Sequence, residues 1–122
     1  LTSFIRQNNR LSLNLLILHF TFGKVLLIME ITDNNFLRQF ETKVNGGLAI
    51  IEYSVQERKI FLTKILVPDM KNKDLFTEKF MSEVLEIIRD RNISVVPTAA
   101  LITKFIRKNR KYKSLLPVGI RI

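Results

Sequence analysis

The sequence predicts a mixed α/β (α+β) domain, in which an antiparallel β-meander leads into a β-α-β crossover and a C-terminal helix. Three observations support this prediction. Strand-like periodicity extends from about residue 35 to residue 67, the apolar spacing becomes helical between residues 75 and 91, and a short β-branched run follows at residues 93–97. With 122 residues, 47% of them hydrophobic, the chain is long enough for one compact domain.

Two turns separate the three strands of the predicted meander. The pair Asn45-Gly46 tolerates the positive φ angles of a tight hairpin turn, so residues 34–44 and 47–55 are predicted to pair antiparallel. The polar residues 56–58 form the second turn, and residues 59–67 give the third strand. Pro68 ends that strand, because proline cannot donate to a strand ladder.

A helix is predicted from Leu75 to Arg91. Its apolar residues fall on one face, namely Phe76, Phe80, Val84, Ile87 and Ile88. The run ISVVP that follows is typical of a buried strand, and a right-handed crossover would pair it parallel to the strand before the helix. Residues 100–112 are then predicted to form a second, basic helix.

The first 28 residues differ from the rest of the chain. Residues 11–28 are largely apolar, but Asn14, His19 and Lys24 interrupt them, whereas a transmembrane helix needs ~20 mostly uncharged residues. Three interpretations stay open: a non-native or leader-like extension, an export or membrane segment, and an extra element packed on the domain. We divide the chain into an extension, residues 1–28, and a domain, residues 29–122, and expect membrane contact only if the extension is native.

Charge and cysteine content narrow the function classes. The chain has a formal net charge of +9, which favours anionic partners such as nucleic acid, an anionic membrane or a phosphorylated cofactor. It has no cysteine, which excludes disulfides, thiolate metal sites and a cysteine nucleophile. We expect no metal and a cytoplasmic location, since a cysteine-free chain is compatible with a reducing compartment.

Residues from about 35 to 116 resemble the short, bacterial-type members of the GNAT N-acetyltransferase superfamily. The resemblance rests on the segments GGLAIIEY, KIFLTKILVP, RDRNISVVP and FIRKNRKYKSLL, and on the spacing between Val67 and Pro97. It implies a GNAT-like core, acetyl-CoA as cofactor, and transfer of an acetyl group to an amine.

The turn before the predicted helix departs from the pattern of that family. There, the resemblance implies a basic-Gly-x-Gly loop whose amides hold the pyrophosphate of the coenzyme at a helix N-terminus. Here residues 72–75 and Thr77 occupy these positions, and each adds a Cβ that crowds a phosphate. Asp74 is predicted to cap the helix and compete for the same N–H groups, while Lys71 and Lys73 supply compensating charge. The alternative is a solvated, capped loop without a ligand.

A second departure follows the buried strand. The resemblance implies a Pro-x-Cys-type segment and then a tyrosine, and this chain has Ala99 and Phe105 instead. The predicted coenzyme-binding residues come from both segments: Leu66, Val67, Lys71, Asn72, Lys73, Asp74, Leu75, Phe76, Thr98, Ala99, Phe105 and Lys108.

Catalytic residues stay unassigned by the sequence. Glu52 and Tyr53 are candidates for a base and an acid. The alternative is a surface charge beside a core aromatic residue.

A basic cluster ends the chain. It comprises Lys104, Arg107, Lys108, Arg110, Lys111 and Lys113. With Phe105 and Tyr112 among them, these cations are able in principle to follow a phosphate backbone and stack a base. They also suit the 3′-phosphate of coenzyme A, or simply the solvated face of an amphipathic helix.

Two functions from different classes therefore remain. The first is an acetyl-CoA-dependent N-acetyltransferase, or a degenerate relative with weak or no activity. The second is a non-enzymatic module whose basic face binds an anionic partner, either nucleic acid or an acidic protein. A coenzyme site requires the two parallel strands to separate near Val67 and Val96, whereas a seam closed by side chains favours the binding module.

Overall fold

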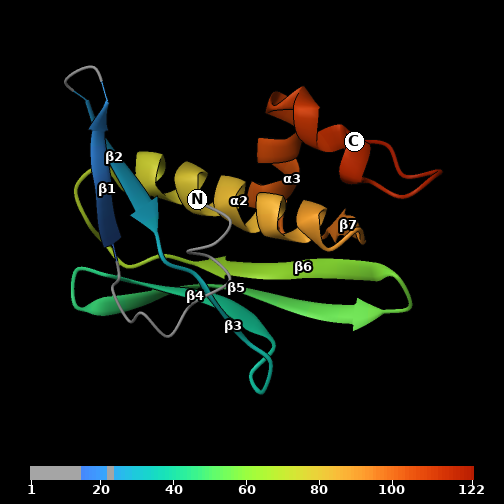
Figure 1. Ribbon diagram of the computed structural model, residues 1–122. Coiled ribbons are helices and arrows are strands. Elements are labelled where there is room, and N and C mark those ends of the chain that lie inside the picture. Colours follow the sequence, from blue (N-terminus) through green and yellow to red (C-terminus); the bar gives the residue numbers. More distant parts are fainter. Residues whose placement is uncertain (1–14, 22–23) are drawn as a thin grey trace.

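The computed structural model describes residues 15–21 and 24–122 (Figure 1). In chain order its elements are β1 (Leu15–Thr21), β2 (Lys24–Met29), β3 (Thr32–Asn34), β4 (Gln39–Val44), β5 (Gly47–Gln56), β6 (Lys59–Leu66), α2 (Lys73–Asp90), β7 (Ser94–Pro97), α3 (Ala100–Lys108) and a 3₁₀ helix (Arg110–Leu115). Strands β3 to β7 form one sheet in that order, and β1 and β2 form a separate antiparallel pair within the extension and at its border. Both α2 and α3 lie on the same side of the five-stranded sheet (Figure 1).

The predicted meander and crossover are present. Strands β4, β5 and β6 pair antiparallel, and β7 pairs parallel to β6. Asn45 and Gly46 have φ angles of 49° and 74°, as a tight hairpin turn requires. The mixed α/β fold class with its antiparallel meander is therefore confirmed.

The start of the first predicted strand is wrong. Strand β4 begins only at Gln39, because residues 35–38 form a turn between β3 and β4. The side chain of Asn34 accepts a hydrogen bond from the N–H of Leu37 at 3.0 Å, and Arg38 has a φ of 57°. A local side-chain bond of this kind competes with the strand ladder, so the chain turns where the alternation suggested a continuous strand.

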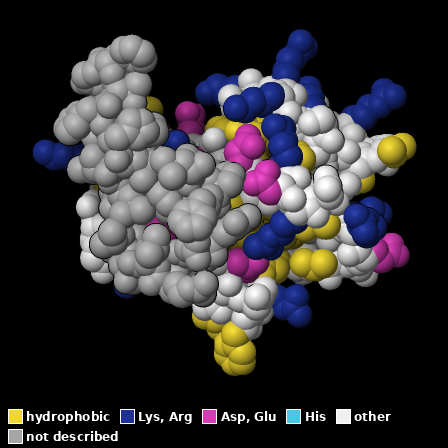
Figure 2. Space-filling model, viewed as in Figure 1, with side chains coloured by type: hydrophobic (Ala, Val, Ile, Leu, Met, Phe, Trp, Pro, Cys, Tyr) yellow, Lys and Arg dark blue, Asp and Glu magenta, His cyan; other side chains and the backbone are white. Residues whose placement is uncertain are grey.

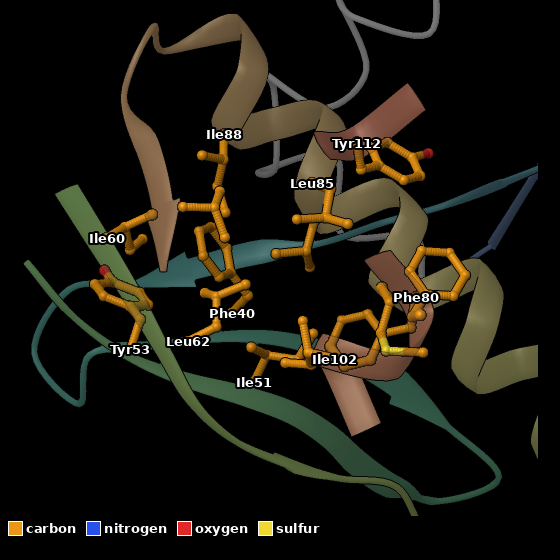
Figure 3. Packing of buried hydrophobic residues seen from close by; sticks show 14 of the residues in the cluster. Phe40, Ile51, Tyr53, Ile60, Leu62, Phe80, Leu85, Ile88, Ile102 and Tyr112 are labelled. Atoms are coloured by element: carbon orange, nitrogen blue, oxygen red, sulfur yellow. The ribbon is translucent and has the colours of Figure 1, made fainter. Parts of the chain in front are cut away.

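The hydrophobic core lies between the sheet and α2. Phe80, Val84 and Ile88 of the predicted helical face are fully buried, and Phe76 and Ile87 pack against the same cluster. Figure 3 shows side chains of the sheet, among them Phe40, Ile51 and Leu62, gathered beneath Leu85 and Ile88 of α2. Thr77, Met81 and Leu85 widen the buried face beyond the predicted set.

The predicted second helix is too long. α3 ends at Lys108, and Asn109 leaves the helical region with φ −112° and ψ 86°. Both the N–H and the side-chain amide of Asn109 donate to the carbonyl of Phe105, at 3.0 and 2.8 Å, which closes the last turn. The 3₁₀ helix that follows buries Tyr112 and Leu115 against the core.

Within the described residues, the structure has no helix that is long and apolar enough to cross a membrane.

A chain that begins at Met29 is expected to fold and to melt cooperatively. Met29 and Ile31 are 4% and 2% exposed and belong to the core, so the packed unit already includes residue 29. Circular dichroism during heating of the shortened and full chains tests this. If the shortened chain were unfolded while the full chain was stable, residues 1–28 would be a structural element of the core.

Tyr53 of β5 is linked to Asp33 of β3, two strands away in the same sheet, through its partly buried hydroxyl. Its hydroxyl donates to Asp33 Oδ1 at 2.5 Å, and Asp33 Oδ2 accepts from the guanidinium of Arg91 at 2.7 Å. Burial, and next the hydrogen bond to Asp33, raises the pKa of Tyr53 to about 12. Since this exceeds the ordinary value of 10.0, the protonated phenol stabilises the folded state fully below pH 10, and this stabilisation is lost as the pH rises through 12.

The free energy of unfolding is therefore expected to fall by about 2 kcal/mol more in the wild type than in Tyr53→Phe as the pH rises from 10 to 12. Urea unfolding of both proteins across this range measures the difference. If the free energy of unfolding fell equally with pH in both proteins, Tyr53 would have the same pKa in the folded and unfolded states.

Candidate functional site

The parallel pair β6–β7 separates before β6 ends. Pairing runs from Lys59 opposite Ser94 to Leu62 opposite Pro97, whereas β6 continues to Leu66. The register between β5 and β6 shifts at the same point, so that Thr63 is an extra residue in β6. β7 itself ends at Pro97, so the pairing stops there, and the bulge in β6 lies at the same point. The separation lies at Leu62 and Pro97, five residues before Val67 and one after Val96.

Hydrogen bonds hold the opened end in place. The amides of Thr98 and Ala99 both donate to the carbonyl of Leu62, at 3.0 and 3.1 Å, and the Thr98 hydroxyl donates to the same oxygen at 3.1 Å. The Thr103 hydroxyl contacts the carbonyls of Pro97 and Ala99, both at 3.1 Å. The chain thus turns away into α3, and residues 63–66 have no neighbouring strand on the β7 side.

A hollow of about 750 Å³ lies between α2 and α3, and we name it the α2–α3 hollow. Phe105, Met81 and Leu101 provide apolar surface, while α3 contributes three cations and α2 contributes a cation and two carboxylates. Its lining is Lys73, Asp74, Thr77, Glu78, Met81, Leu101, Lys104, Phe105, Arg107 and Lys108. A cleft that combines apolar walls with a few charged groups has the composition of a ligand site.

The basic cluster is divided by the fold. Lys104, Arg107 and Lys108 line the α2–α3 hollow, whereas Arg110, Lys111 and Lys113 belong to the 3₁₀ helix. In Figure 2, Lys and Arg side chains gather around the part of the molecule that holds α3 and the C-terminal segment.

The two aromatic residues of the cluster are too buried to stack on bases. Tyr112 and Phe105 are only 1% and 7% exposed, and their rings stack on each other with centroids 5.8 Å apart. Both rings belong to the core because the 3₁₀ helix folds back against α2.

The first turn of α2 begins at a left-handed residue. Asn72 has φ 57° and ψ 37°, and its carbonyl accepts the N–H of Phe76 at 3.0 Å. Among the described residues no side chain caps this helix, so the predicted capping role of Asp74 is wrong. Asp74 is the second residue of the helix. Its negative charge interacts favourably with the positive end of the helix dipole, but its side chain accepts no capping hydrogen bond.

Thr77 occupies the last of the expected glycine positions. Its hydroxyl donates to the carbonyl of Lys73 at 2.7 Å, and its side chain is 7% exposed. A glycine there would leave backbone open to a ligand, whereas Thr77 fills that space and satisfies a helix carbonyl instead.

The predicted coenzyme-binding residues separate into three groups. Lys73, Asp74, Phe105 and Lys108 line the α2–α3 hollow. Lys71, Asn72, Leu75 and Phe76 line a second hollow of about 1140 Å³ on another side of the same helical turn, beside the β4–β5 turn, and we name it the turn hollow. Leu66, Val67, Thr98 and Ala99 line neither hollow. Successive helical residues point in directions about 100° apart, which explains why neighbours diverge.

The two candidate catalytic residues are not brought together. Ala49, Ile51 and Tyr53 are buried on the helix side of β5, so the alternation places Glu52 on the opposite, open side. Glu52 lies opposite Lys64, next to the bulge, and none of the interactions among the described residues engages its carboxylate. The hydroxyl of Tyr53 is held by Asp33.

Sequence reasoning missed Glu78, Met81 and Leu101 as lining residues. The helical period does contain them, because Asp74, Glu78 and Met81 follow one another at intervals of four and three residues on α2. Within the described residues, no group of three His, Cys, Asp or Glu side chains is arranged to hold a metal ion.

Comparisons with known proteins bear on this arrangement. Residues 39–115, more than half of the chain, match the model of the GCN5-related N-acetyl-transferase family. The chain is also similar to the solution structure of a GCN5-like candidate N-acetyltransferase from Staphylococcus aureus, with a TM-score of 0.58 and 21% identity over 75% of this chain and 90% of that chain. At this identity the likeness shows the fold alone. No curated protein matches the sequence.

Proposed function

The chain belongs to the GCN5-related N-acetyltransferase family, and we propose that it binds acetyl-CoA weakly in the α2–α3 hollow and transfers acetyl groups to amines slowly. Two observations support this most: the β6–β7 pairing stops at Leu62 and Pro97, and the α2–α3 hollow has a cationic rim. A closed seam would have favoured the non-enzymatic binding module.

The residues fit the coenzyme in part. The free edge of β6 at residues 63–66 suits the amide-containing pantetheine arm, because an extended chain can pair with an open strand edge. Lys73, Arg107 and Lys108 provide charges for phosphate groups. The first turn of α2 has side chains where close backbone approach needs glycine, and the carboxylate of Asp74 repels phosphate, so we expect weak affinity.

Acetyl-CoA supplies an activated acetyl thioester when it is bound. The chain's own part is to orient an amine and to accept its proton. Glu52 is the acceptor that the sequence suggests, but it lies on the side of the sheet opposite to the α2–α3 hollow. Tyr53 is a poor candidate for the acid, since its hydroxyl is buried against Asp33. Ala99 and Phe105 have no proton to donate to the departing thiolate.

Calorimetric titration with coenzyme A and with acetyl-CoA tests the binding step. We expect a dissociation constant well above the micromolar range in the wild type. The variant Arg107→Glu/Lys108→Glu should weaken binding at least tenfold more than Arg110→Glu/Lys113→Glu, which changes the net charge equally on the 3₁₀ helix outside the hollow. Equal weakening in the two variants would show that the coenzyme is attracted by the net charge and not by the cations of the hollow. Absence of binding at millimolar coenzyme would overturn the proposed function.

A further inference from the structure

The turn hollow combines an apolar interior with an entirely cationic set of charged side chains. Its charged lining residues among the described part of the chain are Lys43, Lys71 and Lys79, with no carboxylate. The apolar lining includes Leu48 and Leu75, which are 44% and 68% exposed. It shares no lining residue with the α2–α3 hollow, so the two hollows are separate candidate sites.

The cations of the turn hollow are largely uncompensated. Lys79 pairs with Glu83 at 3.1 Å. Among the ion pairs between described residues, none includes Lys43 or Lys71. Both lysines are exposed, so their ammonium groups are accessible to an anion, and salt screens that attraction.

The walls of the turn hollow are fixed to each other. A Cβ atom at Gly47 would lie 3.1 Å from Pro68 Cγ, so the absence of a side chain lets the β4–β5 turn pack directly on the segment that leads into α2. Asn45 and Gly46 hold the turn itself in the left-handed region. Both walls therefore exist before any ligand arrives, as is usual for small-molecule sites.

We propose that the turn hollow binds a small ligand that joins one anionic group, a carboxylate or a phosphate, to an apolar body. The anionic group is bound by Lys43 and Lys71, and the apolar body packs on Leu75 and Phe76. An amine without an anionic group is excluded by the same charges. The turn hollow shares no lining residue with the α2–α3 hollow, in which we place the coenzyme, although the sequence assigned four of its residues, Lys71, Asn72, Leu75 and Phe76, to the coenzyme.

Octanoate, octyl phosphate and octylamine are the probes, and amide chemical shifts of the full chain are the readout. Octanoate or octyl phosphate should shift amides at residues 43–48 and 70–76 and saturate, and octylamine should not. The anion that binds with the lower dissociation constant identifies the preferred head group. Lys43→Glu/Lys71→Glu should weaken binding at least tenfold. The matched control, Lys59→Glu/Lys64→Glu, changes the same charge at two exposed lysines of β6 outside the hollow, and should bind as the wild type does.

Three outcomes would overturn the proposal. Absence of saturable shifts with both anions refutes the site. Equal weakening in the two charge-reversal variants assigns the effect to the net charge of +9. Displacement of octanoate by coenzyme A, with shifts at residues 43–48, shows that the turn hollow is part of the coenzyme site. The proposed function itself depends on coenzyme-induced shifts at residues 104–108, so the two ideas fail separately.

Discussion

Turnover of simple amines by this chain is expected to be roughly a hundredfold to a thousandfold lower than that of an acetyltransferase that keeps the glycine loop and the post-strand cysteine and tyrosine. Stabilisation of a leaving group by one proton donor is typically worth a few kcal/mol in the transition state. Ala99 and Phe105 stand where such donors are implied, and residues 72–77 replace the phosphate cradle. The loss of the glycine loop or the loss of the proton donors can be compensated alone, but both losses affect the same expected coenzyme site.

Introducing a tyrosine hydroxyl at residue 105 tests whether the missing proton donor causes the low turnover. Phe105 lines the α2–α3 hollow, so Phe105→Tyr brings a proton donor to that hollow, and we expect at least a tenfold gain in kcat, with Ala99→Cys adding to it. The control Phe36→Tyr adds the same hydroxyl at an exposed phenylalanine that lines neither hollow and should change nothing. Mass spectrometry of the acetylated amine measures all four proteins.

Two kinds of result would contradict the prediction of low turnover. Wild-type turnover at rates ordinary for the family, or a micromolar dissociation constant for acetyl-CoA, would show that other groups replace the missing motifs. An equal gain in Phe36→Tyr and Phe105→Tyr would show that the effect does not arise in the α2–α3 hollow.

The parts of the fold that the sequence predicted are those encoded by neighbouring residues. The Asn45-Gly46 turn needs positive φ angles that these two residues tolerate, and the spacing of Phe80, Val84 and Ile88 predicts a helix without any knowledge of its partner. Both features were found where they were predicted.

The features that the sequence did not predict depend on distant contacts. Strand β3 has three residues, too few for a period, and Asp33 within it binds Arg91, which is 58 residues away. The break after Lys108 lacks glycine and proline, and it exists because Tyr112 packs on Phe105 and lies beside Ser82. Local patterns contain no information about such contacts.

The candidate site was predicted only as a region. The residues of one helical turn were assigned to one ligand, yet Lys73 and Asp74 line one hollow while Asn72 and Leu75 line the other. The helical period alone separates these pairs. The position of α3, which supplies the second wall, depends on how Pro97, Thr98 and Ala99 attach to Leu62, and no sequence period predicts those bonds.

Tyr112→Ala is expected to destabilise the protein by about 3–5 kcal/mol, the usual cost of removing a large buried aromatic side chain. The ring is 1% exposed and stacks on Phe105. It lies 5.6 Å from the Arg89 guanidinium carbon and 5.0 Å from Lys111 Nζ, and its hydroxyl is 3.1 Å from Ser82 Oγ. Its loss opens a cavity between α2, α3 and the 3₁₀ helix and takes a large part of the ~5–15 kcal/mol that stabilises a typical domain.

Two matched variants separate packing from hydrogen bonding at Tyr112. Tyr112→Phe keeps the ring and loses only the bond to Ser82, so urea unfolding should show a loss of about 1 kcal/mol, and Ser82→Ala should show a similar loss. The double variant should lose less than the sum of the two, because both changes remove the same bond. Since the ring in Tyr112→Phe still supports Phe105, its coenzyme affinity should equal that of the wild type. A loss below 1 kcal/mol in Tyr112→Ala would mean that the 3₁₀ helix is only loosely attached and does not hold Phe105 at the α2–α3 hollow.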